Sequence, residues 1–222
     1  MKPMLRKSEF AAFAIVVLSF AIAVYFYQSP LMPDVMPSHW NAAGQVDGYM
    51  DKFWGIFLMP IISAVMFALF LAIPRIEPLR ENLEKFRREF GIFVIIIMAF
   101  MVYIYLLTIL WALGKKFNMV QFLMPALAVL LYYAGVLLKK AKRNWFVGIR
   151  TPWTLSSDRV WDKTHKRGGA MFKVVALFTA FGIFMPEYAI WLLLVPVLAV
   201  AVYLAAYSYL EYKKETGKGK KK

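Results

Sequence analysis

The sequence contains no cysteine, only 2 histidines and few acidic residues. Without cysteine, the chain has no disulfide framework, no thiol nucleophile and no cysteine-based metal site. Its 13 Asp and Glu stand against 27 Lys and Arg, which leaves a formal net charge of +14. Such a balance often indicates nucleic-acid binding. Here the basic residues lie between long apolar runs, and that arrangement favours contact with anionic lipid headgroups instead.

Apolar residues make up 61% of the chain, whereas a soluble domain has about 45–50%. Six apolar runs are long enough, or nearly so, to cross about 30 Å of hydrocarbon. These runs are Phe10–Tyr27, Phe53–Ile73, Gly91–Leu113, Met119–Leu138, Ala170–Pro186 and Ala189–Leu210. The fifth is the weakest, because it is short and carries Lys173, which we expect to reach the interface. We therefore predict an all-α integral membrane protein with six transmembrane helices.

The basic residues between these runs predict the orientation. The N-terminus, the loops after the second and fourth runs and the tail together hold 23 Lys and Arg, whereas the other loops hold 3. Because cytoplasmic loops collect Lys and Arg, both termini are expected in the cytoplasm. Pro60, Pro125 and Pro196 recur early in the even-numbered runs. They suggest three parallel in–out–in hairpins, although an early proline is common in any membrane helix.

The expected external loop, Ser29–Lys52, has three prolines and two glycines. This punctuation predicts an ordered, turn-rich segment rather than a helix. Polar side chains in it can form a small metal or ligand site; they are Asp34, His39, Asn41, Asp47 and Asp51. The alternative is an external cap that aromatic side chains hold at the membrane interface; these are Trp40, Tyr49 and Trp54.

The cytoplasmic segment Pro74–Phe90 has its apolar residues three and four apart. Ile76, Leu79, Leu83, Phe86 and Phe90 then share one helical stripe, which predicts an amphipathic helix over 76–90. We expect the stripe to pack on lipid or on the bundle. A docking surface for a cytosolic partner is the alternative.

The longest cytoplasmic loop, Lys139–Gly169, spends about thirty residues where a few suffice. It predicts a compact turn followed by a helix from about Ser156. Its candidate functional residues are Asn144, Gly148, Arg150, Thr151, Pro152, Trp153, Asp158, Trp161, Asp162 and His165. Arg150 is expected to pair with Asp158 or Asp162. The two aspartates and His165 suit salt bridges, partner contacts or a divalent cation, and Gly168-Gly169 permits a hinge.

These loops resemble those of the SdpI family of bacterial and archaeal multi-spanning membrane proteins. The segment NWFVGIRTPWTLSSDRVWDKTHKRGG is similar to the family signature, and PRIEPLRENLEKFRREF fits the family's other loop. PSHWNAAGQVDGY resembles the pattern of an associated domain of unknown function. That pattern implies an external site formed by Pro37, His39, Asn41, Gly44 and Asp47.

The resemblance implies an immunity factor and receptor in a prokaryotic cell membrane. Its expected partners are the lipid bilayer, a membrane-active peptide and a cytosolic transcriptional repressor, with no direct contact to nucleic acid, no cofactor and no enzymatic activity. We expect a four-span region over 1–138, an SdpI-like loop and hairpin over 139–212 and a disordered basic tail over 213–222.

Two other functions stay open. The first is a transporter or channel for a lipid or neutral solute. The spans have no ionisable groups in their middle, which disfavours proton-coupled transport but leaves a path for a lipid or neutral solute open. The second is an enzyme that acts on a lipid-linked substrate at the cytoplasmic face.

Overall fold

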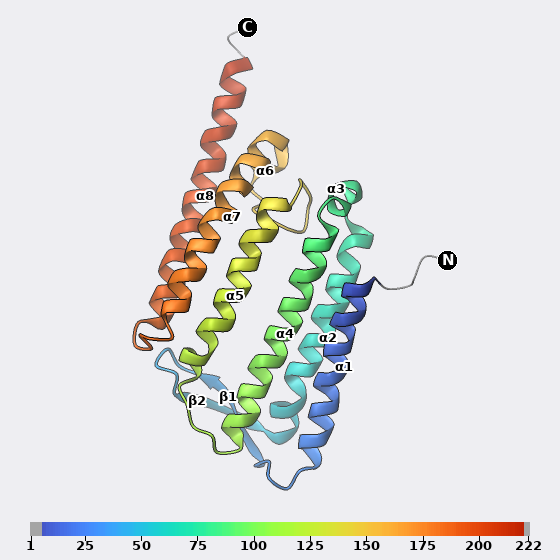
Figure 1. The fold of residues 1–222 in the computed structure, drawn as a ribbon, viewed down its shortest axis with the longest axis vertical. Coiled ribbons are helices and arrows are strands. Elements are labelled where there is room, and N and C mark those ends of the chain that lie inside the picture. The colour runs from blue at the N-terminus through green and yellow to red at the C-terminus, as the bar shows by residue number, and fades with distance from the viewer. Residues whose placement is uncertain (1–5, 220–222) are drawn as a thin grey trace, which may run out of the picture.

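The computed structural model describes residues 6–219. Figure 1 shows long helices side by side, with a short β-hairpin at one end of the bundle and short helices and loops at the other. The helices are α1 (Lys7–Gln28), α2 (Lys52–Ile76), α3 (Arg80–Glu84), α4 (Arg87–Ala112), α5 (Met119–Lys140), α6 (Pro152–Ser156), α7 (Asp158–Phe181) and α8 (Ala189–Gly219); the strands are β1 (Val35–Trp40) and β2 (Val46–Asp51). We call the two ends the hairpin end, which holds β1 and β2, and the loop end, which holds α3 and α6.

The long helices form two groups. α1, α2 and α4 pack on one another, and α5, α7 and α8 do the same, while α4 and α5 join the two groups. The most extensive contact of α5 is with α7. In space α5 therefore lies with the last two helices, whereas the division at residue 138 assigns it to the first four spans.

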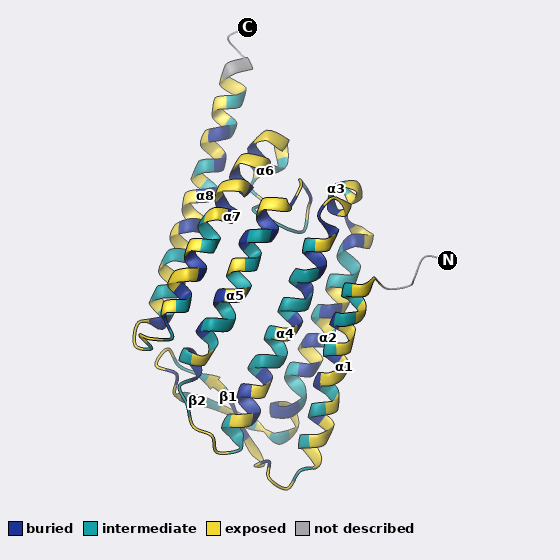
Figure 2. Ribbon diagram, in the orientation of Figure 1, coloured by how far each residue is buried: buried dark blue, intermediate teal, exposed yellow. Residues whose placement is uncertain are grey.

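Five helices are long and apolar enough to cross a membrane, namely α1, α2, α4, α5 and α8. Large apolar side chains face outward on them, such as Leu69, Leu198 and Val202, and Figure 2 shows exposed residues along the outer helix faces. Such a surface requires lipid as its solvent. Among the long helices, α7 is not apolar enough to cross a membrane over its full length. Its first half is polar, and only the part from Ala170 is apolar.

The hairpin end corrects the expectation of an all-α protein. Val35–Trp40 and Val46–Asp51 pair as antiparallel strands. The Asn41 side-chain oxygen accepts hydrogen bonds from the amides of Ala43 and Gln45, each at 3.0 Å, and Gly44 takes a positive φ of 77°. The segment is turn-rich and not helical, as expected, but its turn closes a two-stranded sheet.

The expected helix over 76–90 is wrong as a single element. α2 continues to Ile76, α3 covers only Arg80–Glu84, and α4 begins at Arg87. The expected packing holds for Leu83, Phe86 and Phe90, which are buried in a core that also contains Leu137 and Trp161 of the second helix group. It does not hold for Ile76, which is exposed. A chain that bends twice places the three buried side chains inward better than a straight helix between two antiparallel spans.

Two further expectations about the last two helices are wrong. α7 runs unbroken through Gly168 and Gly169, so these residues are not a hinge. They permit close packing instead: a Cβ on Gly169 would lie 2.5 Å from the carbonyl oxygen of Gly135 in α5. The tail expected to be disordered over 213–222 is helical as far as Gly219, and residues 220–222 lie outside the described part of the chain.

Candidate functional site at the loop end

The loop between α5 and α7, residues 141–157, which we call the signature loop, is built around the buried side chain of Asn144. Its amide nitrogen donates to the carbonyl oxygens of Lys142 and Val147, both at 2.8 Å. Its oxygen accepts from the amides of Phe146 and Val147 at 2.9 and 2.6 Å. Asn144 is fully buried, so these four bonds replace water for the whole amide group. The residue therefore fixes the loop and is not available to a ligand.

His165 fixes the next part of the loop. Its Nε2 accepts a hydrogen bond from the Ile149 amide at 2.9 Å, and its Nδ1 donates to the Trp161 carbonyl at 2.9 Å. This pattern requires the neutral Nδ1–H tautomer. Burial is the main cause that lowers the pKa of His165 to about 4. The imidazole is thus neutral at physiological pH, and both nitrogens already have protein partners.

The indole of Trp161 packs beside this imidazole. The two rings stack with centroids 3.9 Å apart, and the Trp161 Nε1 donates to the Ala141 carbonyl at 2.9 Å. Gly148 lies against the imidazole with φ at 124°, and a Cβ there would come within 2.4 Å of the His165 Nε2. The glycine is therefore required both by its backbone conformation and by the space that His165 occupies.

Thr151 and Glu77 tie the signature loop to its neighbours, while Thr154 bonds within the loop. The buried Thr154 hydroxyl donates to the Ile149 carbonyl at 2.7 Å, and the Thr151 hydroxyl contacts that of Ser208 in α8 at 3.0 Å. On the other side, the buried Glu77 accepts from the Trp145 amide at 3.0 Å. The Asn82 side chain donates to the Arg143 carbonyl at 2.9 Å. The loop is thus bonded to both helix groups.

The charged residues of the signature differ from the expected arrangement. Arg150 donates to the Trp145 carbonyl at 2.5 Å and pairs with neither aspartate. Asp158 pairs with Arg143 at 2.7 Å and Asp162 with Lys142 at 3.1 Å. The short helix α6 separates Arg150 from α7, and this displacement is why the expected pair does not form.

The remaining candidates lie at the surface of the loop end. Pro152 is exposed and Trp153 is half-buried, with its ring centroid 5.1 Å from that of Tyr209 in α8. The signature residues therefore separate into a buried set that shapes the loop and an exposed set, chiefly Arg150, Pro152 and the two aspartates, that faces outward.

An apolar groove, with about 720 Å³ of empty volume, lies directly against the signature loop. α2, α4, α5 and α7 each contribute to it, for example through Phe70, Phe93, Ala134 and Phe172, and the loop contributes residues 146–149. It is partly open, and it is the place where the two helix groups and the signature meet. Asn144 and His165 act here indirectly, because they position the loop backbone that covers the groove.

The candidates at the hairpin end form a turn rather than a pocket. Pro37 is buried in β1, and Asn41 and Gly44 build the turn. His39 pairs with Asp47 at 2.5 Å, with both side chains largely exposed. Trp40 stacks edge-on against Trp111 of α4. This geometry fits the cap held by aromatics.

Metal ligands do not converge within the described residues 6–219, where no group of three or more His, Asp or Glu side chains is placed to hold an ion. The pair His39–Asp47 lacks a third ligand. His165 is buried with both ring nitrogens bonded, whereas Asp158 and Asp162 are exposed. The divalent-cation interpretation of either loop is therefore not supported by the geometry.

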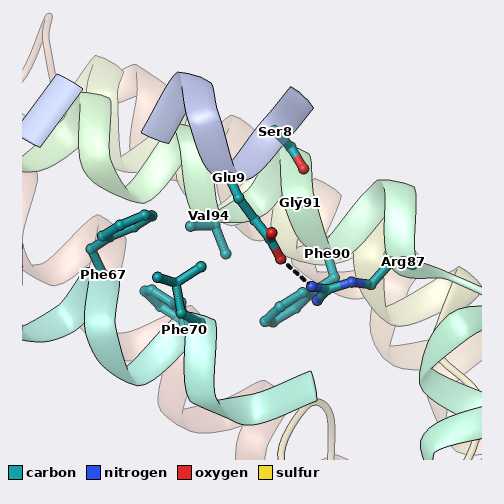
Figure 3. A pocket seen from close by; sticks show the side chains of 9 residues that line it. Ser8, Glu9, Phe67, Phe70, Arg87, Phe90, Gly91 and Val94 are labelled. Carbon is teal, nitrogen blue, oxygen red and sulfur yellow. Dashed lines mark hydrogen bonds and ion pairs between the residues drawn. The ribbon is translucent and has the colours of Figure 1, made fainter. Parts of the chain in front are cut away.

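A buried ion pair closes the loop end of the first helix group. Glu9 of α1 points toward Arg87 of α4 and bonds to it beside Phe90, in a pocket that Phe67 and Phe70 also line (Figure 3). A second pair, Arg6–Glu84, spans 2.7 Å at the surface. Both pairs hold α1 against the segment that follows α2.

Comparison with known proteins identifies both signature regions. Residues 140–208 match the SdpI/YfhL protein family, and residues 14–64 match a domain of unknown function, DUF1648. The chain carries an SdpI-family domain. It is also 24% identical to the immunity protein SdpI of Bacillus subtilis strain 168, over 95% of this chain and 99% of that protein. No solved structure matches the chain.

The SdpI-family domain covers α6, α7 and most of α8, together with the signature loop. Sequence reasoning placed the candidate site in this loop but missed four residues that position it or the hairpin: Glu77, Asn82, Thr154 and Asn118. Glu77 and Asn82 carry a weak signal as polar residues within an amphipathic segment. Thr154 stands in a Thr-x-x-Thr spacing that suits a helix cap, and Asn118 precedes an apolar run in the same way.

Proposed function

We propose that this protein is an immunity factor of the cell membrane that protects its host against a membrane-active peptide. The observation that carries the proposal is the similarity to an immunity protein along almost the whole of both chains. The outward apolar surface and the five long apolar helices are consistent with action in the bilayer. His165 takes no part in catalysis in this proposal, because both of its ring nitrogens already bond to the protein.

Protection is tested by expression in cells that lack SdpI and are sensitive to the toxin that SdpI counters. We expect the cells that express this protein to grow in the presence of the toxin as well as cells that contain SdpI. The matched pair of variants is Gly148→Ala, which distorts the signature loop, and Gly114→Ala, which has nothing within 4 Å of the added Cβ. Full sensitivity of cells that contain normal amounts of the wild-type chain in their membrane would disprove the proposal.

We further propose six spans with both termini in the cytoplasm. The fifth span, which is short, is the apolar half of α7 with the turn that follows it. The absence of native cysteine allows a clean test by single cysteines and an impermeant thiol reagent. Gln45→Cys and Tyr188→Cys are expected to react from outside, whereas Lys142→Cys reacts only after the membrane is opened; all three side chains are exposed. If Tyr188→Cys does not react with external reagent, the fifth span does not cross the membrane.

The exposed set of the signature offers a surface for a cytosolic repressor, the second partner that we propose. Arg150, Pro152 and Trp145 face outward beside one another on the ordered loop. Arg150→Glu is expected to abolish co-purification of a repressor with membranes while leaving the amount of protein unchanged, because its guanidinium makes a single carbonyl contact. A repressor bound equally by this variant would place its site elsewhere.

A further inference from the structure

α7 and α8 form one edge of the bundle (Figure 1), where α8 packs chiefly on α7. A second apolar groove, with about 660 Å³ of empty volume, runs between these two helices, and we call it the edge groove. Ala170, Val174 and Phe178 line it from α7, and Ala199 and Val200 line it from α8. Val174 and Phe178 are 54% and 48% exposed. The edge groove therefore opens toward the surroundings of the bundle and not into its core.

A polar contact between α7 and α8 closes the edge groove on the side of the loop end. Arg167 precedes the lining residue Met171 by four positions on α7, and Tyr203 follows Ala199 by four positions on α8. Residues four apart share one face of a helix, so both side chains lie one turn beyond the groove on the faces that line it. The Arg167 guanidinium donates a hydrogen bond to the Tyr203 hydroxyl. This bond between the two helices places Arg167 at the mouth of the groove.

The Arg167 guanidinium is held in place but not neutralised. Its central carbon lies 4.5 Å from the ring centroid of Tyr207 and 5.9 Å from that of Tyr203, and both rings attract the cation. Arg167 is exposed and forms no ion pair with a carboxylate among residues 6–219. A guanidinium has five N–H donors, so donors remain for an anion at the mouth of the groove.

The mouth of the edge groove lies where the helices change from apolar to basic. α7 is polar before Ala170 and apolar after it. At Gly169 it packs on the basic end of α5, because a Cβ there would lie 2.5 Å from the Lys139 Cγ. Two neighbouring helices thus change character at one level, and tyrosines such as Tyr203 favour the same level of a membrane. Arg167 is therefore expected at the depth of the lipid headgroups.

We propose that the edge groove binds one acyl chain of an anionic phospholipid and that Arg167 binds the phosphate of the same lipid. The walls are apolar and face the bilayer, and a guanidinium matches two phosphate oxygens with paired hydrogen bonds. The wall on α7 from Ala170 to Phe178 rises about 12 Å. That is close to half of the hydrocarbon core, which is about 30 Å thick. The groove thus suits the tail of a lipid from one leaflet, with its headgroup at the arginine.

The headgroup contact is tested by native mass spectrometry of the detergent-released full chain with phosphatidylglycerol or phosphatidylcholine of identical acyl chains. The wild type is expected to retain one phosphatidylglycerol about fivefold more strongly than phosphatidylcholine, which is the effect of one arginine on an anionic lipid. Arg167→Gln should remove that preference. Its control, Arg80→Gln, removes the same charge from an exposed arginine of α3 and should keep the preference. A folded Arg167→Gln chain that keeps it would overturn the assignment of the phosphate to Arg167.

The tail is tested separately, at an exposed alanine of the groove. Ala199→Phe should weaken retention of both lipids about fivefold or more, because overpacking an occupied site has a cost of that order. Ala201→Phe adds the same volume at an exposed position of α8 that does not line the groove, and it should retain both lipids. Thermal melts verify that each variant is folded.

Two further results of these measurements would overturn the proposal. The first is equal retention of the two lipids by the wild type, or full retention by Ala199→Phe. The second is a dimer that Ala199→Phe separates into monomers, because a second copy of the chain would then occupy the edge groove. Neither readout depends on immunity.

Discussion

At the hairpin end, segments that are close in sequence pair through their backbones, while at the loop end side chains bond to backbone groups far along the chain. β1 and β2 are joined by the five residues 41–45, and Asn118, the N-cap of α5, bonds the hairpin tip through a 2.9 Å bond to the Ala43 carbonyl. The signature loop instead depends on Asn144, His165, Thr154 and Glu77, all buried.

This difference teaches which end tolerates change. Backbone pairs survive most substitutions because the side chains are not the bonding groups. A loop that is bonded through buried side chains loses several partners with each substitution, since every orphaned buried group costs about 1–3 kcal/mol. The loop end is therefore expected to be the more sensitive, and matched variants at the two ends measure by how much.

The largest contrast is expected between Gly148→Ala and Gly114→Ala. Both glycines have positive φ, at 124° and 90°, but only Gly148 is crowded, by the His165 imidazole. Backbone strain of about 1 kcal/mol applies to both, and overpacking adds about 1–3 kcal/mol to the first alone. Thermal unfolding in detergent should show Gly148→Ala destabilised by about 2–4 kcal/mol and Gly114→Ala by about 1 kcal/mol. Equal losses would mean that the imidazole moves aside freely.

The second contrast is between the two histidines as pH falls. The unfolded chain gains a proton at His165 near pH 6.5, whereas the folded chain gains one only near pH 4. The unfolded state therefore binds more protons in this window, and stability falls as pH drops from about 6.5 to 4 by up to about 3 kcal/mol. Melts across this range should lose most of that slope in His165→Gln and keep it in His39→Gln, since His39 is largely exposed. If His39→Gln removed the pH dependence of stability, His165 would not be its source.

The smallest contrast pairs two asparagines. Asn144 makes four bonds in a fully buried site, whereas Asn118 accepts from the Gln121 amide and donates to Ala43 at the surface. Asn144→Ala should cost about 2 kcal/mol more than Asn118→Ala, because it strands buried amides and carbonyls that water cannot reach. Chemical unfolding in the same detergent gives both values. A larger loss of unfolding free energy from Asn118→Ala would show that the hairpin end is more sensitive to substitution than the loop end.

The long helices could be predicted from the sequence, but the contacts that they make with other segments could not. The apolar runs reflect a solvent property, and five of the six predicted spans agree with long apolar helices. The hairpin was missed because Pro37 weakens a strand pattern, although Val46–Asp51 alternates and Asn41 with Gly44 marks the turn. For strands that are neighbours in sequence, the residues of the turn are therefore the signal from which the hairpin could have been predicted.

Pairings across the fold were harder to predict than positions along it. The Trp161 and His165 rings are neighbours, as their spacing of four indicates, but nothing local tells that both are buried. Arg150 was given the wrong partner because α6 intervenes, and Glu77 was missed because its partner amide lies at Trp145, which is 68 residues away. Such contacts depend on how the two helix groups meet, which a single sequence does not encode locally.

The approach of Gly135 to Gly169 has a consequence for the way this protein can change over generations. A Cβ at either position would meet the carbonyl oxygen of the other glycine, at 2.7 and 2.5 Å. A second replacement at the facing position cannot relieve the first, because the obstacle is backbone and not side chain. Neither site has a compensating partner, so any lineage that departs from glycine at one of them must move the backbones of α5 and α7 apart at this contact.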